Sequence, residues 1–135
     1  MSVILRPGTP ADAEICGSIA FEAFRAIASA HGFPWDFPSA DVAIGLMKTL
    51  LAHPGFYSVV AEEDGAVVGS NFVDERGTIA GIGPITVSPG AQNRSTGRQL
   101  MNAVIERSNA RGAAGIRLLQ SAYHNRSLCL YTKLG

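Results

Sequence analysis

Charged side chains are scarce in this chain of 135 residues, because only 16% are Asp, Glu, Lys or Arg and the formal net charge is zero. A chain without excess positive charge has no bulk attraction for nucleic acid or for an anionic membrane. No apolar run approaches the roughly 18 residues that a membrane-spanning helix needs, and residues 1–20 lack the layout of a secretion signal. The sequence therefore predicts a single-domain, soluble cytoplasmic protein that binds neither nucleic acid nor membrane.

Cysteine and histidine are also rare, with two and three copies respectively. Cys16 and Cys129 lie far apart in apolar segments with a helical pattern, which is typical of buried free thiols. No histidine has metal-ligand spacing from a cysteine or a carboxylate, so we expect no metal site.

Apolar periodicity and turn residues divide the chain into strands and helices. Strands are expected over 3–5, 56–61, 66–73, 78–87 and 115–120, and helices between Thr9 and His31, between Ser39 and Pro54, from about Arg94 to Arg111, and from Asn125 onward. In the first two helices the apolar residues that recur at helical spacing are Ile15, Ile19, Ala23, Ala26, Ile27, Val42, Leu46, Met47, Leu50 and Leu51. The order strand-helix-helix-three strands-helix-strand-helix predicts an α/β fold with a mixed sheet (α+β).

The fourth expected strand contains Gly81, Gly83 and Pro84. These residues weaken regular pairing, so they favour a bulge or a splayed edge within the strand. The strand ends at Val87, and a loop of small and polar residues connects it to the next helix.

That loop has the composition of an anion-binding site. A helix that starts there offers backbone N–H groups and the positive end of its dipole, which suit a phosphate. Gly97 allows close approach of the backbone, and Arg94 and Arg98 supply forked, charged donors. A plain capped helix, with Asn93 or Ser95 as the cap and the arginines in solvent, explains the same residues equally well.

Two common phosphate motifs do not fit the loop, because Gly90 and Gly97 are too far apart for a P-loop and Thr86 replaces the third glycine of a dinucleotide motif. A third pattern, V-x-P-x-x-Q-x-x-G-x-G, resembles residues 87–97 closely. It is the acyl-CoA signature of the GNAT-type (GCN5-related) N-acetyltransferases. Residues 125–135 resemble a second motif of that family, N-x-x-x-x-x-Y-x-K-x-G. The resemblance covers the whole chain and implies the GNAT acyl-CoA N-acyltransferase fold.

The resemblance also implies a role for each matched position. The pantetheine arm would be contacted by Ile85, Thr86 and Val87 on the fourth strand and by Asn125. The loop and the first helical turn would bind the pyrophosphate, through Gln92, Asn93, Arg94, Ser95, Thr96, Gly97 and Arg98. Tyr131 would protonate the leaving thiolate, which suits a phenol because its pKa of about 10 is close to that of a thiol. Without the motif, Tyr131 is better explained as a core aromatic residue at helical spacing.

The implied reaction is acetyl transfer from acetyl-CoA to a primary amine of a small molecule or peptide by direct attack. Backbone N–H groups of the fourth strand would stabilise the oxyanion. Because residues 78–87 contain no carboxylate, the general base is left to a water relay or to Asp74 or Glu75. Most acidic residues precede residue 90, and the loop with Trp35, Asp36 and Phe37 lies where members of the family bind the acceptor. These features, together with Asp41, predict a cationic acceptor.

Two departures from the family pattern shape the alternatives. Ser95 stands at the first glycine of the motif, where a Cβ costs little only if the local dihedral angles are helical.

The chain ends at Leu134–Gly135, whereas relatives usually continue with Phe and two more strands. We therefore expect strand 115–120 to pair with a second copy in a homodimer, or the chain to be the N-terminal part of a longer one. The alternatives to an enzyme are a non-catalytic acyl-CoA-binding half of a tandem acetyltransferase and a structural domain without a ligand.

Overall fold

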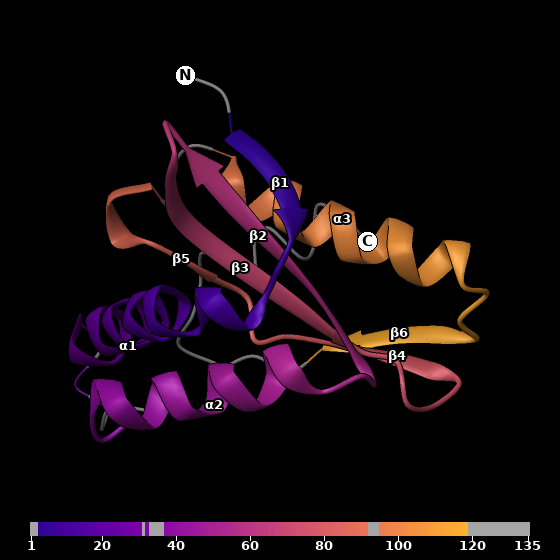
Figure 1. The fold of residues 1–135 in the computed structure, drawn as a ribbon, viewed down its shortest axis with the longest axis horizontal. Coiled ribbons are helices and arrows are strands. Elements are labelled where there is room, and N and C mark those ends of the chain that lie inside the picture. Colours follow the sequence, from indigo (N-terminus) through magenta and orange to yellow (C-terminus); the bar gives the residue numbers. More distant parts are fainter. Residues whose placement is uncertain (1–2, 31, 33–36, 92–94, 119–135) are drawn as a thin grey trace.

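A central sheet with helices on both faces forms the fold (Figure 1). The computed structural model describes residues 3–30, 32, 37–91 and 95–118. Its elements are β1 (Val3–Pro7), a 3-10 turn (Pro10–Asp12), α1 (Ala13–Ala30), α2 (Ala40–Ala52), β2 (Phe56–Glu63), β3 (Ala66–Asp74), β4 (Ile79–Ile82), β5 (Thr86–Val87), a second 3-10 turn (Pro89–Ala91), α3 (Thr96–Ala110) and β6 (Gly115–Leu118). The expected α/β class is confirmed. The helix expected from Asn125 and the last two residues of the expected strand 115–120 lie outside the described residues. Among the helices that the structure describes, none is long and apolar enough to cross a membrane.

The sheet has the strand order β1-β2-β3-β4-β6, and β5 pairs with β3 beyond the end of β4. Neighbouring strands are antiparallel except β4 and β6, which are parallel because the crossover helix α3 joins the β4–β5 segment to β6. The β2–β3 hairpin turns at Asp64 and Gly65, as their sequence predicted. Both residues have positive φ, 54° and 81°, as tight hairpin turns require.

The fourth expected strand is divided in two by the break that its glycines and proline predicted. Ile82 of β4 stands opposite Val73 of β3, and Thr86 of β5 stands opposite Ser70. Three residues of the β4–β5 segment therefore face two residues of β3, which is the arrangement of a β-bulge. The bulge changes the face toward which successive side chains of this segment point.

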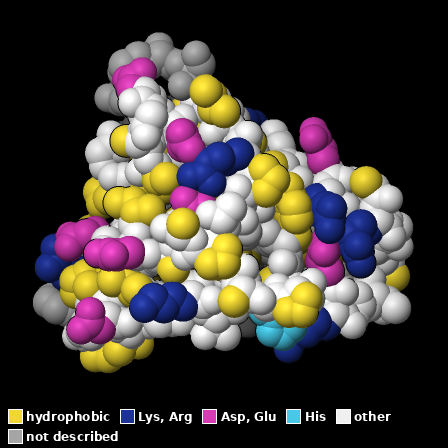
Figure 2. All heavy atoms as spheres, in the orientation of Figure 1, with side chains coloured by type: hydrophobic (Ala, Val, Ile, Leu, Met, Phe, Trp, Pro, Cys, Tyr) yellow, Lys and Arg dark blue, Asp and Glu magenta, His cyan; other side chains and the backbone are white. Residues whose placement is uncertain are grey.

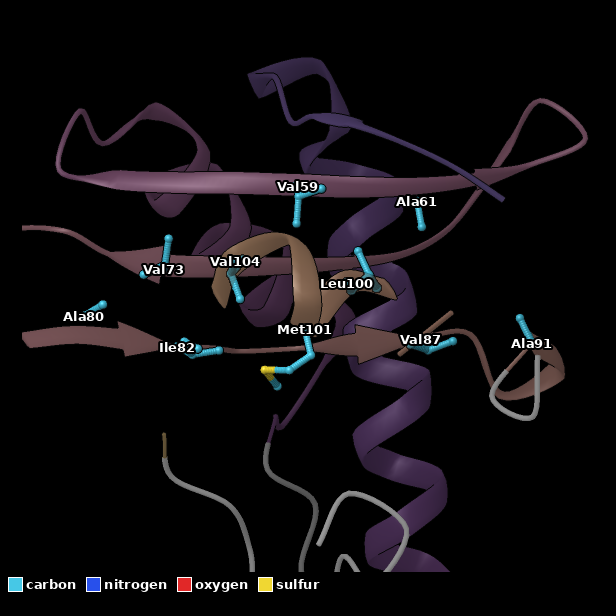
Figure 3. Packing of buried hydrophobic residues seen from close by; sticks show 10 residues of the cluster. All are labelled: Val59, Ala61, Val73, Ala80, Ile82, Val87, Ala91, Leu100, Met101 and Val104. Atoms are coloured by element: carbon cyan, nitrogen blue, oxygen red, sulfur yellow. The ribbon is translucent and has the colours of Figure 1, made fainter. Parts of the chain in front are cut away.

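Two apolar clusters cover opposite faces of the sheet. The first lies between the sheet and α3, where the side chains of Ile82 and Val87 lie beside Met101 (Figure 3). It also contains Val59, Ala61, Val73, Ala80, Ala91, Leu100 and Val104. The second lies between the sheet and the pair α1 and α2, and contains Ala13, Cys16, Ala20, Met47, Leu50, Val60 and Phe72. Alternate residues of β2 and β3 thus enter different clusters, as the period of a strand dictates.

Helical spacing predicted α1 and α2 correctly, but not all of the residues that are buried. Ile15, Ala26, Val42 and Leu46 are exposed, Val42 to 49%. Small residues take their places in the interior, including Gly17, Ala20, Ala28 and Ala43. The reason is the close approach of the two helices, because a large side chain at their contact would hold the backbones apart.

The start of α1 is tied to the sheet by a buried ion pair. Asp12 is only 7% exposed, and its two carboxylate oxygens accept hydrogen bonds from both terminal nitrogens of Arg6, each at 2.8 Å. Arg6 also pairs with Glu62 of β2, and the Thr9 N–H donates to Asp12 Oδ2 at 2.8 Å. The hydrogen bonds from Arg6 lower the pKa of Asp12 to about 2. Asp12 therefore acts as a charged anchor between β1, β2 and the first helical turn.

Candidate functional site

Strand β5 forms one side of the candidate site, and its backbone alternates in direction. The Ser88 N–H donates to the Val68 carbonyl oxygen at 2.7 Å, and Val87 stands opposite Gly69. In an antiparallel ladder the backbone groups of every second residue point away from the partner strand. The backbone groups of Val87 therefore point away from β3, while those of Thr86 point toward it. The Thr86 backbone therefore faces β3 rather than the candidate site.

Gly69 allows β5 to lie close to β3. A Cβ built at Gly69 would be 2.7 Å from the Thr86 carbonyl oxygen and 3.0 Å from Leu100 Cδ1. Any larger residue would push β5 or α3 outward, so Gly69 fixes the spacing of the two elements that form the site.

A buried polar group lies under β5, on the side of α1. The Ser70 and Thr86 hydroxyl oxygens are 3.3 Å apart, and both residues are buried. Cys16 of α1 is also buried, and burial raises the pKa of its thiol to about 11. The prediction of a buried free thiol is confirmed for Cys16, whereas Cys129 lies outside the described residues. A thiol with such a pKa is a poor nucleophile at neutral pH, so Cys16 serves packing rather than covalent chemistry.

Ser95 immediately precedes α3 in a left-handed conformation, with φ 61° and ψ 5°. The helical dihedral angles under which serine would cost little are therefore absent, and an L residue here costs about 1–2 kcal/mol. The Ser95 side chain does not cap α3, although the plain-helix interpretation named Asn93 or Ser95 as the cap. Its hydroxyl oxygen instead accepts a hydrogen bond from Gln99 Nε2 at 3.3 Å. The left-handed φ explains why the sequence motif has glycine at this position.

The N-terminus of α3 presents several donors together. Thr96 is fully buried, and its hydroxyl oxygen has no hydrogen-bond partner in the described part of the chain. The first N–H groups of an α-helix also lack acceptors within the helix. Gly97 is half-buried and the exposed Arg98 adds a full charge. Unpaired N–H groups, a buried hydroxyl and a guanidinium fit the oxygen atoms of a phosphate, so this helix end could hold a phosphate-bearing cofactor.

The two carboxylates considered as general bases are both held by arginines. Arg76 binds both oxygens of Asp74, at 2.9 and 2.7 Å, and lowers the pKa of Asp74 to about 2. Glu75 accepts from Arg107 at 2.8 and 3.1 Å and lies 3.3 Å from Arg111. Both carboxylates lie at the end of β3 that pairs with β4, whereas β5 pairs nearer its start. Their position and their ion pairs disfavour a role as the base.

The remaining predicted site residues are only partly within the described structure. Phe37 packs its ring against Phe24 of α1 in an edge-to-face arrangement, with centroids 5.7 Å apart, so it anchors the segment before α2. The predicted site residues that lie outside the described ranges are Trp35, Asp36, Gln92, Asn93, Arg94, Asn125 and Tyr131. Sequence reasoning missed Ser70 and Asn71, although two polar residues inside an otherwise apolar strand are a signal that can be found.

Comparison with known proteins identifies the class to which this site belongs. The model of the acetyltransferase (GNAT) family matches residues 19–135. The chain therefore belongs to the GNAT acetyltransferase family, and it is an N-acetyltransferase by that membership. The family resemblance of the two sequence motifs and the expected fold are both confirmed. A search of curated proteins found no match.

Solved structures share the fold at low sequence identity. The PaiA N-acetyltransferase from Thermoplasma acidophilum, solved with coenzyme A, has a TM-score of 0.83 at 15% identity over 100% of this chain and 89% of that chain. The aminoglycoside N-acetyltransferase AAC(6')-Iy, solved with a bisubstrate analogue, has a TM-score of 0.76 at 16% identity, covering 100% and 90%. An aminoglycoside acetyltransferase from an uncultured soil metagenomic sample has 0.73 at 24% identity, covering 100% and 91%. Acetyl-CoA is the cosubstrate that membership of the family implies.

Proposed function

We propose that this chain transfers an acetyl group from acetyl-CoA to a primary amine of a small molecule or peptide. The observation that carries the proposal is the packing of α3 against β5, which brings the donors at the start of the helix next to the bulged strand. A ligand with an anionic diphosphate at one end and an amide-containing arm at the other complements these two neighbouring features.

The described residues divide the binding work between them. In this proposal the first-turn N–H groups of α3, the Thr96 hydroxyl and Arg98 bind the pyrophosphate, and residues 85–87 bind the pantetheine arm, as the sequence motif implies. Acetyl-CoA supplies the acetyl group as an activated thioester. The amine nitrogen forms a bond to the acetyl carbon while the carbon–sulfur bond breaks, and Tyr131 provides the proton that the departing sulfur takes. The nitrogen gives up one proton to a water relay, which returns a proton to the Tyr131 phenolate.

Direct attack is favoured over a covalent acetyl-enzyme. Cys16 is the one cysteine among the described residues, and it is buried with a raised pKa. A transfer through this thiol would require it to ionise away from solvent, which burial opposes. The amine therefore reacts with the bound thioester without a prior transfer to Cys16.

The acceptor is proposed to be a cationic amine. Acidic and basic side chains both lie on the face formed by α1 and α2 (Figure 2); Glu14 and Asp41 are exposed there, and Glu22 pairs with Arg25. Exposed carboxylates such as Glu14 and Asp41 attract cationic ligands. Among the similar folds, AAC(6')-Iy was solved with an analogue of an acetylated aminoglycoside fragment, acetylneamine. Exchange of Asp36 and Asp41 for Asn should raise the acceptor KM and leave the acetyl-CoA KM unchanged.

Thermal unfolding with and without acetyl-CoA tests the proposed function. At about a hundred times its Kd, a ligand stabilises the folded state by about 2.7 kcal/mol, or roughly 10 °C in the melting temperature of a domain of this size. The double variant Arg94→Ala with Arg98→Ala should lose this shift. Arg111→Ala removes one charge from the other end of α3 and should keep it.

Turnover separates an enzyme from a binding domain. Tyr131→Phe should retain the thermal shift and lose most of the acetylation rate with an amine acceptor. A thermal shift without turnover by the unmodified chain would favour the non-catalytic acyl-CoA-binding alternative, and no shift would favour the structural one. The homodimer and the cytoplasmic location stay predictions from the sequence.

A further inference from the structure

Asn71 is a fully buried amide in the middle of β3. Its Nδ2 donates to the Leu100 carbonyl oxygen in α3 at 3.3 Å, and its Oδ1 accepts from the Phe72 N–H at 2.9 Å. The neighbouring β3 residue on the same face, Val73, belongs to the apolar cluster under α3. An amide in such surroundings is costly unless hydrogen-bonded, and here its two hydrogen bonds offset that cost. Unlike an apolar side chain, these directional bonds hold α3 at one position against β3.

The position of Asn71 in the sheet suggests a role for these bonds. Between the pairs Val73–Ile82 and Ser70–Thr86, β3 contributes residues 71–72 and the opposite segment contributes 83–85. Asn71 thus stands across from the bulge, and its side chain reaches the second turn of α3. This side chain thereby connects α3, which is proposed to bind the pyrophosphate, with β3. On either side of Asn71, β3 pairs in turn with the segment proposed to bind the pantetheine arm.

We infer that Asn71 is a positioning residue that sets the distance between the two halves of the coenzyme A site. The inference rests on the proposed function. The two ends of coenzyme A are covalently joined, so the strand and the helix must hold a fixed separation for both ends to bind at once. The hydrogen bond to Leu100 fixes α3 along the sheet at the level of the bulge. Asn71 acts through β3 and α3, and it is not proposed to touch either substrate.

Dissection of the ligand distinguishes this role from general stabilisation. Affinities of the full-length chain would be measured by calorimetry or competition for coenzyme A, for its nucleotide half (3′-phosphoadenosine 5′-diphosphate) and for pantetheine. In Asn71→Ala we expect coenzyme A to bind about tenfold more weakly, while each half binds within about twofold of its affinity for the unmodified chain. Asn71→Leu keeps the side-chain volume and removes the donor to Leu100, so it should give the same pattern.

Ser108→Ala is the matched control. Ser108 is buried at the other end of α3, and its hydroxyl donates to the Val104 carbonyl oxygen at 2.8 Å. This variant removes a buried hydrogen bond from the same helix and should lower the melting temperature without changing any of the three affinities. All measurements are made below each melting temperature, where circular dichroism shows the native fold.

Two results would overturn the inference. One is an affinity of both Asn71 variants for coenzyme A within about twofold of the unmodified chain. The other is a loss of the same proportion for coenzyme A and for its halves. Failure of the unmodified chain to bind coenzyme A would instead remove the proposed function, and the inference with it.

Discussion

Gly17 of α1 lies directly against the backbone of Ile44 in α2. A Cβ built at Gly17 would be 2.4 Å from the Ile44 Cα and 2.7 Å from its nitrogen. Real Cβ atoms do not come this close to backbone atoms, so the two helices can pack as they do only with glycine at this position. This contact accounts for the small residues that occupy the interior of the α1–α2 pair.

Replacement of Gly17 by Ala should therefore destabilise the fold. Overpacking against backbone atoms should lower the free energy of unfolding by about 1–3 kcal/mol, measured by urea denaturation. Gly45→Ala in α2 is the control, because nothing lies within 4 Å of a Cβ there and alanine should add about 0.5–1 kcal/mol. Equal effects of the two substitutions would show that the helices are not in close contact.

The buried Arg6–Asp12 pair predicts a loss of stability in acid. The pKa of Asp12 is about 2 in the folded chain and 3.8 in its ordinary state. The contribution of its carboxylate to the free energy of unfolding is therefore complete above about pH 3.8 and disappears as the pH falls toward 2. Asp12→Asn should lower the free energy of unfolding by about 2 kcal/mol at neutral pH, and the difference from the unmodified chain should shrink below about pH 4. Urea denaturation across this range measures the effect.

Glu14→Gln provides the comparison for the acid prediction. Glu14 is an exposed carboxylate in the first turn of α1, so the substitution changes the same charge without breaking a buried pair. Its effect should stay within about 0.5 kcal/mol at every pH. A difference for Asp12→Asn that does not depend on pH would contradict the assignment of the effect to the Asp12 carboxylate.

Ser95→Gly should improve both stability and coenzyme A binding. Glycine adopts the left-handed φ of 61° without the cost that serine carries, so we expect a gain of about 1 kcal/mol in the free energy of unfolding. It also removes a Cβ beside the donors at the start of α3, so the Kd for coenzyme A should fall. Ser95→Ala keeps the backbone cost and loses the contact with Gln99, and it should give neither gain.

Cys16 should resist thiol reagents in the native state. In a Cys129→Ser background, labelling at about pH 8 should be negligible before unfolding and complete in urea, as measured by mass spectrometry. Cys16→Ser should retain acetyltransferase activity, because the thiol is not the nucleophile in the proposed reaction. Rapid labelling of the native chain would contradict the burial of this thiol, and loss of activity in a folded serine variant would contradict direct attack.

The helices and the broken strand could be predicted because their signals are local. Ser39 begins α2 and its hydroxyl accepts from the Val42 N–H at 3.4 Å, as capping chemistry suggests. Gly83 and Pro84 indicated the interruption between β4 and β5, and the two motifs indicated the family. These features depend on residues within one turn or one strand of each other, so a single sequence contains the information.

Other parts of the site depend on contacts between distant residues. The partners Arg6 and Asp12 become a buried pair only when the β1–β2 register is known, and Asn71 meets Leu100 only through the packing of α3. Ser95 illustrates a different difficulty, since serine normally avoids the left-handed region and its φ is imposed by the surrounding loop and helix. No periodicity in the sequence reports such constraints.

The extra residue opposite β3 also sets the phase of the chain along the β4–β5 edge. Ala80 and Ile82, at even positions, enter the cluster beneath α3, and after the bulge the odd-numbered Val87 does so. Deletion of one residue from the intervening segment would reverse this parity, carrying the Thr86 hydroxyl into the apolar cluster and Val87 toward Ser70. The length of the segment is therefore as constrained as its composition, because a chain shortened by a single residue there would exchange the two faces of β5.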